Sequence, residues 1–282
     1  MNVPAQLDGL ERELRLHRVE SLQPFGFAVV PPGFNELRGD ELVLSTLSGL
    51  TFGYRKGDGV RMAASGALPP DDREVELWLH GSIRNAVAAI HGLIPIHASA
   101  IATPGGVIAI AGPSGSGKST TAMMLAGKEA EWFADDTLLL DPNTHMCLPG
   151  RRQWKLDTDA MAMVGARANG PPLAIDDKFR GIPPGGGVQS ATRLAEIVLL
   201  EKGGETAFHP ISAGQAAAGL LADSDRWHLY ARALESDAAG VLGFFARFCG
   251  NIGCHRLIRG PRGNAAAIRQ AVRPLLEGHS PS

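Results

Sequence analysis

The fold of this chain is decided by residues 107–126, which read VIAIAGPSGSGKSTTAMMLA. The apolar run Val107–Ala111 predicts a buried strand, and Thr120–Ala126 opens a predicted helix. Between them, residues 112–119 match the pattern G-x-x-x-x-G-K-[ST] without a mismatch. A strand, a glycine-rich loop and a helix in this order predict a P-loop that binds a nucleoside triphosphate.

Each part of this loop has a physical reason to hold phosphate. Glycines let backbone amides point inward at phosphate oxygens, and the start of the helix directs its positive dipole end at the same anion. Lys118 is expected to reach the β- and γ-phosphates, and Ser119 to bind Mg²⁺. We therefore expect ATP and Mg²⁺ as ligands, with the nucleotide held by Gly112, Pro113, Ser114, Gly115, Ser116, Gly117, Lys118, Ser119 and Thr120.

The segments around the loop predict an α/β fold in two parts. Short apolar runs separated by turn residues indicate a β-rich N-terminal subdomain over residues 1–75, with runs at Phe25–Val30, Glu41–Leu47, Leu50–Arg55 and Val60–Ala63. Residues 76–282 are expected to form a P-loop NTPase-like catalytic domain, in which strands alternate with helices. In it we expect a helix at Val75–His91, strands at Ile96–Ala102, Glu131–Ala134, Thr137–Leu140, Leu194–Glu201 and His255–Arg259, and mostly helices after Ser212.

Composition excludes several classes of partner. The 282 residues carry a net charge of −2, so no basic field draws the chain to nucleic acid or to an anionic membrane. No apolar run approaches the ~20 residues of a membrane-spanning helix. Residues 1–18 mix acids and bases, unlike a signal peptide, and the three cysteines do not suggest a disulfide framework. The expected location is the cytoplasm.

Two adjacent carboxylates, Asp135 and Asp136, follow the apolar run Phe133-Ala134. Such a pair suits a Mg²⁺–nucleotide site, because one carboxylate can face the metal while the other accepts a proton. Aspartates are also common in turns and helix caps. The position of the pair directly after the P-loop helix favours the site, so the candidate metal ligands are Ser119, Asp135 and Asp136.

One further residue brings these motifs into a familiar order. His97 opens the strand before the P-loop strand. The order His97, P-loop, Ala134-Asp135-Asp136 resembles HPr kinase/phosphorylase, a bacterial P-loop protein serine kinase. The spacings from His97 to Gly112 and from Lys118 to Asp136 are similar to those of that family. The resemblance covers about residues 93–141 well and the rest of the chain loosely.

The sequence also departs from that family. HPr kinases have Ser-Glu after the lysine, whereas Thr120 follows Ser119 here, and their Glu-x-Arg-Gly segment corresponds to Lys178-Phe179-Arg180-Gly181. The loop associated with the reverse reaction has no recognisable counterpart. The segments Ile96–Ala100 and Leu194–Glu201 are similar to the lasso-peptide kinase branch, whose members phosphorylate precursor peptides of ribosomally made modified peptides.

The resemblance implies a serine kinase whose acceptor is a peptide or small protein, with a lasso-type precursor peptide expected. The resemblance also implies that the chain could form a homo-oligomer, since HPr kinases assemble as hexamers. The resemblance implies His97, Lys118, Asp135 and Asp136 as catalytic residues. Phosphoryl transfer also needs charge neutralised on the γ-phosphate, for which Lys118, Lys178 and Arg180 are the candidates. Asp136 is favoured as the base and Asp135 for the metal or His97, although adjacent carboxylates couple and leave this division open.

Several alternatives stay open. His97 is also compatible with a core histidine, and Lys178 and Arg180 with a solvated basic stretch. The basic cluster Arg151, Arg152 and Lys155 indicates either a site for an acidic peptide or a solvated face.

The function has two alternatives as well. A P-loop ATPase such as a transporter motor shares this loop, and Ser212-Ala213-Gly214-Gln215 resembles a second nucleotide-contact loop of such motors. No strand ending in Asp-Glu follows that segment, which argues against this alternative. A nucleotide-sensing module without phosphotransfer is the other alternative, and the intact His97 and paired aspartates argue against it.

Overall fold

The computed structural model describes residues 3–65, 70–127, 129–172, 177–222, 224–260 and 265–278. The chain divides into two compact units, Met1–Leu93 and Ile94–Ser282. The boundary expected after residue 75 lies inside helix α2 (Asp72–Trp78). The division comes later because the helical segment that follows residue 71 belongs to the N-terminal unit, where α3 (Arg84–Ile90) contacts α1 (Val3–Glu13) and the sheet.

A five-stranded sheet forms the centre of the N-terminal unit, in the order β1-β5-β4-β3-β2. Only β1 and β5 pair in parallel among these strands. Three of the four predicted runs are strands, but Phe25–Val30 is not: a 3₁₀ turn, η1 (Gln23–Phe25), precedes an irregular stretch there. The strands are β1 (Leu16–Arg18), β2 (Asn35–Arg38), β3 (Glu41–Ser45), β4 (Leu50–Arg55) and β5 (Gly59–Ala64).

The helical segment after Asp71 is interrupted. The Asp71 side chain accepts a hydrogen bond from the Arg73 amide and caps α2. A π-helical turn, η2 (Leu79–Ile83), then joins α2 to α3, and Gly81 within it has non-helical angles (φ −99°, ψ −106°). The single helix expected at Val75–His91 is therefore two helices, joined where glycine tolerates a kink.

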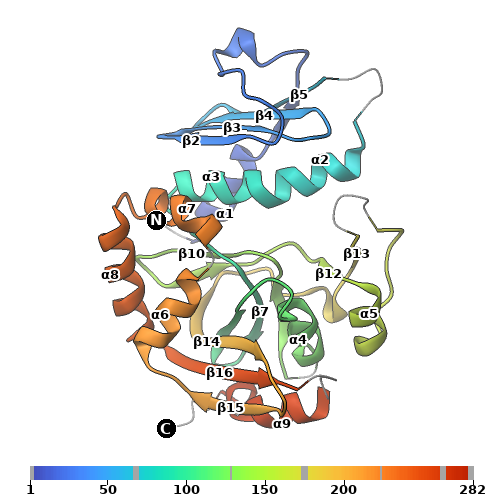
Figure 1. Ribbon diagram of the computed structural model, residues 1–282, viewed down its shortest axis with the longest axis vertical. Helices are drawn as coiled ribbons and strands as arrows, with labels where there is room; N and C mark the ends of the chain where they lie inside the picture. Colours follow the sequence, from blue (N-terminus) through green and yellow to red (C-terminus); the bar gives the residue numbers. More distant parts are fainter. Residues whose placement is uncertain are drawn as a thin grey trace. The chain divides into compact units, whose positions relative to one another are not determined.

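The C-terminal unit is built on a larger mixed sheet that runs β6-β10-β11-β14-β8-β7-β9, with β16 beside β14 and β15 beside β16 (Figure 1). Its strands are β6 (Ile94–Ile96), β7 (Ala98–Thr103), β8 (Gly106–Ala111), β9 (Glu131–Ala134), β10 (Leu138–Leu140), β11 (Met146–Leu148), β14 (Thr192–Lys202), β15 (Ala207–Pro210) and β16 (Gly253–Arg259). A separate two-stranded antiparallel sheet pairs β12 (Trp154–Leu156) with β13 (Phe179–Gly181), and α5 (Thr158–Val164) lies between these strands in the sequence. We call this pair of strands the β12–β13 hairpin.

Three strands of this sheet set the position of the predicted P-loop. The strands β8, β14 and β16 are mutually parallel, with β14 in the middle. Their carboxyl ends therefore meet at one edge of the sheet, and ligands of open α/β sheets bind at such an edge. The P-loop follows β8 at this edge.

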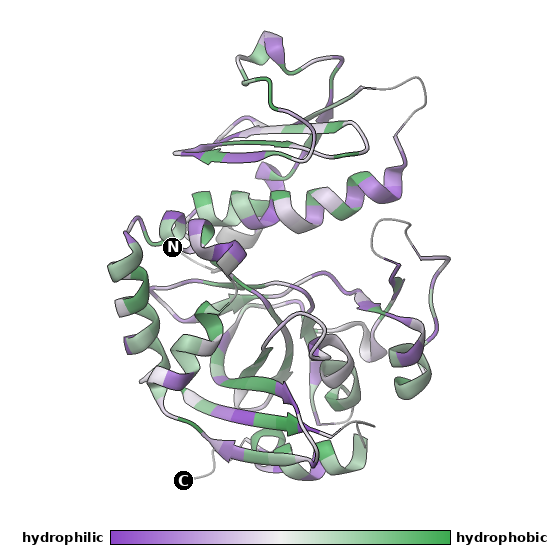
Figure 2. Ribbon diagram, in the orientation of Figure 1, coloured by the Kyte–Doolittle hydropathy of each residue, from purple (hydrophilic) through white to green (hydrophobic). Residues whose placement is uncertain are grey.

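Helices cover the parallel strands. The helices are α4 (Lys118–Leu125), α5 (Thr158–Val164), α6 (Ala213–Leu221), α7 (Trp227–Ala233), α8 (Ala238–Cys249) and α9 (Ala265–Leu276), with the short turns η3 (Pro184–Gly186) and η4 (Ser224–Arg226). Ile108 and Ile110 of β8, Val198 of β14 and Leu257 of β16 share one buried cluster with α4 and α9. Figure 2 shows hydrophobic stretches in α9 and both hydrophobic and hydrophilic residues along β16.

This arrangement confirms the predicted α/β class and is consistent with a P-loop NTPase fold. The predicted strands at Glu131–Ala134, Leu194–Glu201 and His255–Arg259 are present as β9, β14 and β16. None of the helices in the described ranges is long and apolar enough to cross a membrane.

Candidate functional site: a P-loop with two unequal carboxylates

The loop between β8 and α4 has the backbone shape that its glycines predict. Gly112, Gly115 and Gly117 have φ values of 141°, 73° and 97°, which side-chain-bearing residues rarely adopt. A Cβ on Gly112 would also lie 2.5 Å from the Leu200 carbonyl oxygen of the neighbouring strand. The first glycine is thus required both by its backbone conformation and by close packing against β14.

Lys118 lies across this loop. It is the first residue of α4, its side chain is buried, and its Nζ donates to the carbonyl oxygens of Gly112 (3.0 Å) and Pro113 (3.2 Å). The ammonium group is therefore held over the start of the loop. There it can exchange carbonyl oxygens for phosphate oxygens, as expected for the lysine of this motif.

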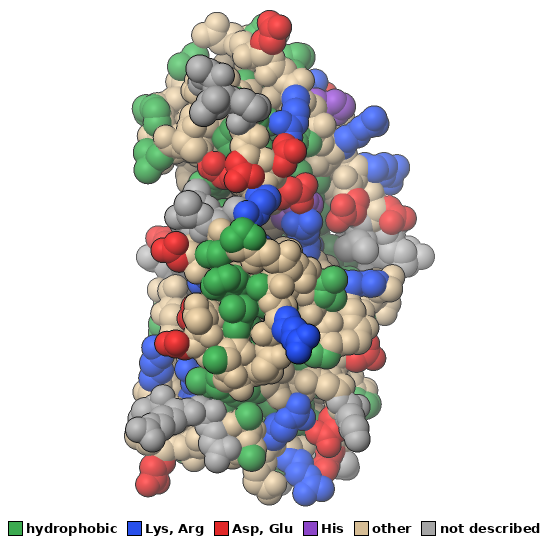
Figure 3. Space-filling model, turned by 90° about the vertical axis from the view of Figure 1, so that its right-hand side faces the viewer, with side chains coloured by type: hydrophobic (Ala, Val, Ile, Leu, Met, Phe, Trp, Pro, Cys, Tyr) green, Lys and Arg blue, Asp and Glu red, His purple; other side chains and the backbone are tan. Residues whose placement is uncertain are grey.

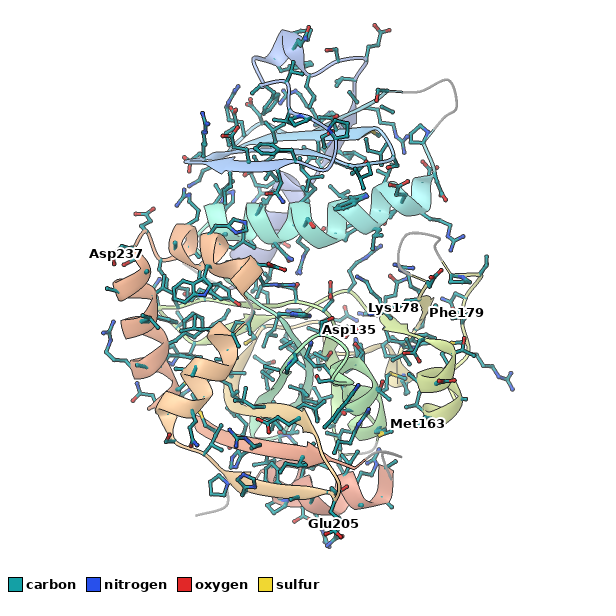
Figure 4. The ribbon with its side chains drawn as sticks, in the orientation of Figure 1. Asp135, Met163, Lys178, Phe179, Glu205 and Asp237 are labelled. Carbon is teal, nitrogen blue, oxygen red and sulfur yellow. The ribbon has the colours of Figure 1, made fainter. Side chains whose placement is uncertain are left out.

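Asp135 follows β9 and is tied to the P-loop through hydroxyl groups. Its Oδ1 accepts a hydrogen bond from Ser99 Oγ (2.7 Å), its Oδ2 accepts one from the Lys155 amide (3.0 Å), and Ser119 also hydrogen-bonds to it. Burial raises the pKa of Asp135, and the hydrogen bonds from Ser119 and Ser99 oppose that rise only in part. Figure 4 labels Asp135 close to α4, the helix that carries Ser119.

Asp136 has different neighbours, although it is the next residue. Its backbone is left-handed (φ 66°), and its Oδ2 lies 3.3 Å from Lys155 Nζ. Burial raises the pKa of Asp136, but the positive charges of Lys155, Arg226 and His97 outweigh burial and bring it to about 2. The two carboxylates are therefore perturbed in opposite directions.

Two of these cations were not identified as site residues from the sequence. Lys155 contacts both aspartates, through its backbone amide and through its ammonium group. Arg226 donates to the backbone oxygens of Pro95 (3.0 Å) and Asp136 (3.3 Å) and to Thr137 Oγ1 (2.9 Å). In the sequence, Lys155 was noted only as part of a basic cluster of undecided role. No pattern near Arg226 indicated that it would lie beside aspartates about 90 residues earlier in the chain.

His97 lies between β6 and β7 and lines a cavity of about 490 Å³. The same cavity is lined by Gly112, Pro113 and Ser114 of the loop, by the end of α6, and by Arg226. His97 is also one of the charges that lower the pKa of Asp136. The structure thus brings together His97, the P-loop and the aspartate pair, as the order of motifs predicts.

Lys178 and Arg180 lie on the hairpin beside this pair. Arg180 is directly opposite Lys155 in the β12–β13 register, so the two side chains project from the same face. Lys178 is exposed just before β13, and its carbonyl accepts a hydrogen bond from Arg180 Nη1 (3.1 Å). Of the two basic candidates, the structure places Arg180 across from Lys155, the lysine that contacts the carboxylates.

The hairpin and α5 lie on the side of the unit that faces the viewer in Figure 3. Hydrophobic side chains gather on this face together with basic ones. Met163 of α5 (43% exposed) and Ile182 after β13 (65% exposed) are large apolar side chains that reach solvent. Figure 4 labels Met163, Lys178 and Phe179 on these same elements.

The donors near the loop fit Mg²⁺ rather than a softer metal. Ser119, Asp135 and Asp136 offer oxygen atoms, which Mg²⁺ prefers, and Mg²⁺ is commonly held by few protein groups together with substrate phosphates. No group of three His, Cys, Asp or Glu residues that could hold a metal occurs in the described part of the chain. A metal at this loop would therefore be shared with the nucleotide.

Part of the chain matches a known family. The model of the ABC transporter family matches residues 97–215, from His97 to Gln215, which is less than half of the chain. None of the curated proteins matches. The match gives no support to the resemblance to HPr kinases or lasso-peptide kinases.

The segment at the end of this match has a structural role in the chain. Ser212 caps α6 and Gln215 completes a capping box, with Gln215 N donating to Ser212 Oγ (3.3 Å) and Ser212 N donating to Gln215 Oε1 (3.0 Å). The matched part that carries nucleotide chemistry is the loop and the carboxylates after it. The match, the motif and the fold together support a P-loop nucleotide-binding domain, and binding of ATP with Mg²⁺ is consistent with them.

Proposed function

We propose that this domain transfers the γ-phosphate of ATP to a hydroxyl group of an organic acceptor, as a kinase. The observation that carries the proposal is the difference between the two aspartates. Asp135 is bonded to Ser119 of the loop, whereas Asp136 is kept ionised by Lys155, Arg226 and His97. Pairs of acidic groups whose environments move their pKa values apart commonly have different tasks in one site.

In this mechanism the loop amides and Lys118 hold the triphosphate. Mg²⁺, when bound with ATP, would neutralise charge on the phosphate oxygens. Asp135 keeps Ser119 oriented through their hydrogen bond. These residues position the γ-phosphate, and positioning together with charge stabilisation supplies most of the catalysis in phosphoryl transfer.

Asp136 would accept a hydrogen bond from the hydroxyl group of the acceptor. A carboxylate with a pKa of about 2 is a weak base, so its task is to orient the hydroxyl and to take the proton late. That order suits the loose transition state of phosphoryl transfer, in which the nucleophile is little activated. Lys155 and His97 then act through Asp136, by keeping it ionised.

The acceptor we propose is a serine of a peptide or small protein, with a lasso-type precursor peptide as the specific case. The cavity of about 490 Å³ beside His97 and the loop is large enough for one side chain and its backbone. The exposed apolar residues Met163 and Ile182, together with Lys178 and Arg180 on the hairpin, offer a surface for the adjacent peptide residues.

A second candidate is ATP hydrolysis, with water as the acceptor. The family match favours this function, since it supports a P-loop ATPase without indicating any organic acceptor. The same loop, Lys118 and Asp135 would serve it, and Asp136 would then orient water. The two functions differ only in whether Asp136 orients an organic hydroxyl group or water.

One labelling experiment separates these functions. The protein is incubated with Mg²⁺, ATP labelled at the γ-phosphate, and candidate serine peptides, and label is followed in peptide and in inorganic phosphate. Kinase activity predicts labelled peptide that is lost in Asp136→Asn and kept in Asp159→Asn, whose exposed carboxylate lies on α5. Label in inorganic phosphate alone, with every peptide, would establish the ATPase and refute the kinase.

A further inference from the structure

Arg259 ends β16 at the same edge of the sheet as the P-loop. Its guanidinium group lies against Gly117, the residue before Lys118. A Cβ on Gly117 would be 2.5 Å from Arg259 Nη1 and 2.8 Å from Cζ. The Arg259 backbone is fixed by a hydrogen bond from Gly203 N to its carbonyl oxygen (2.9 Å), so the side chain leaves from an anchored strand end.

Two of the three nitrogen atoms of the Arg259 guanidinium group are not satisfied within the described chain. Its Nε and Nη1 are buried and have no hydrogen-bond partner among the described residues. By contrast, Arg226, which lines the cavity beside the loop, donates to three oxygen atoms. Burial also lowers the pKa of Arg259, as expected for a cation that is partly removed from water.

The position of these donors suggests what they bind. The backbone at Gly117 starts α4, whose amides and dipole attract phosphate, and Lys118 lies over the opening of the same loop. A guanidinium group presents a planar set of N–H donors that matches phosphate oxygens in a bidentate geometry. A phosphate chain in the loop would supply the acceptors that Arg259 lacks.

We propose that Arg259 binds the phosphate chain of the nucleotide, as a second cation beside Lys118. The proposal rests on ATP binding by the loop and is independent of the acceptor. The role of Arg259 can therefore be refuted while the kinase proposal stands, and the kinase proposal can be refuted while the role of Arg259 stands. Sequence alone gave no indication of this role, since Arg259 lies near the end of the chain, far from Lys118 in sequence.

The test is a set of binding titrations by calorimetry with Arg259→Gln, Arg259→Lys and Arg256→Gln. Arg256 lies on the same strand and pairs with Glu201 (3.1 Å), so it is a control for loss of one positive charge. The ligands are MgATP, MgADP, magnesium pyrophosphate and AMP. Arg259→Gln is expected to lower the affinity for MgATP, MgADP and pyrophosphate by a similar factor of about 10–100, because charge-assisted hydrogen bonds are lost. Arg256→Gln is expected to lower these affinities by less than about twofold.

Each outcome decides the role of Arg259. Arg259→Lys should keep part of the affinity, since it retains the charge without the planar donors. Unchanged affinity of Arg259→Gln for pyrophosphate, with weaker ATP binding, would mean contact with the nucleoside and would overturn the proposal. Equal loss in Arg259→Gln and Arg256→Gln would overturn it too. Melting temperatures without ligand are measured for each variant, and a folding defect in Arg259→Gln moves the decision to Arg259→Lys.

Discussion

Replacing Lys155 by methionine should separate catalysis from stability. Lys155 Nζ lies 3.3 Å from Asp136 Oδ2, and the Lys155 backbone amide donates to Asp135. Methionine keeps the backbone amide and most of the length of the side chain but removes the charge. The substitution therefore acts on Asp136 and leaves the hydrogen bond to Asp135 in place.

The effect on stability is expected to be small. Two unit charges 3.3 Å apart interact by about 5 kcal/mol at an effective dielectric constant of ~20. However, 24% of the Lys155 side chain and 43% of the Asp136 side chain are exposed, so water screens most of that energy. Exposed ion pairs contribute about 0.2–1 kcal/mol, which corresponds to a fall in melting temperature of at most ~4 °C in a unit of this size.

The effect on turnover is expected to be much larger. Burial raises the pKa of Asp136, and Lys155 is the strongest of the three cations that lower it to about 2. Without Lys155 the pKa rises, and the carboxylate loses the contact that fixes its orientation. A misplaced acid–base group lowers kcat by about 10²-fold or more, which is ~2.7 kcal/mol at the transition state.

The assay compares kcat and its pH profile for the parent, Lys155→Met and Arg152→Met. Arg152 belongs to the same basic cluster and is exposed, so it controls for the loss of one charge. The acid limb of the Lys155→Met profile should lie at higher pH than that of the parent. Turnover within twofold of the parent, or an equal loss in Arg152→Met, would refute the assignment of Asp136 as the group that orients the acceptor.

The two aspartates and the β12–β13 hairpin lead to three further predictions. Burial raises the folded-state pKa of Asp135, so its contribution to stability is present at low pH and lost as pH rises. Asp135→Asn should therefore melt at a higher temperature than the parent at pH 7 without ligand, yet lose the Mg²⁺-dependent stabilisation by ATP. For Asp136 the pH dependence has the opposite sign, because its pKa is lowered in the folded state. Ionised Asp136 stabilises the fold above its pKa in the unfolded chain, about 3.9, and this stabilisation is lost as the pH falls towards about 2. The difference in unfolding free energy between the parent and Asp136→Asn, measured with urea, should vanish over that range. A Cβ on Gly181 would lie 2.1 Å from the Trp154 ring, so Gly181→Ala should destabilise the unit by about 1–3 kcal/mol, and unchanged urea unfolding would contradict this packing.

The parts of the site that could be predicted are those formed by short, continuous segments of the sequence. The P-loop needs only its own segment, the strand before it and the helix after it, so its shape follows from local sequence. Asp135 and Asp136 follow an apolar run that is a strand with the expected bounds, Glu131–Ala134. The order of His97, loop and carboxylates was enough to predict that they lie together.

The parts that could not be predicted depend on pairing between distant segments. Lys155 lies on β12, which is held in place by pairing with β13, a strand that follows only after α5 and a long connection. Arg259 reaches the loop because β16 is parallel to β14, which is parallel to β8. No local pattern records such a pairing. The left-handed backbone of Asp136 could not be predicted from the sequence either, since its cause is the packing around a non-glycine residue.

The backbone conformation at Asp135 and Asp136 places two identical side chains in different environments, so that they can have different roles. Thr137 N donates to the Asp135 carbonyl oxygen (2.8 Å), which closes a tight turn, and Asp136 takes the left-handed conformation within it. The turn directs Asp135 to the hydroxyl groups of Ser99 and Ser119 and Asp136 to Lys155. Adjacent carboxylates in one environment would share a proton and repel each other, and neither would be reliably ionised. Separation by the turn leaves one carboxylate for the nucleotide and one for the acceptor, which is the division that transfer to either a hydroxyl group or water requires.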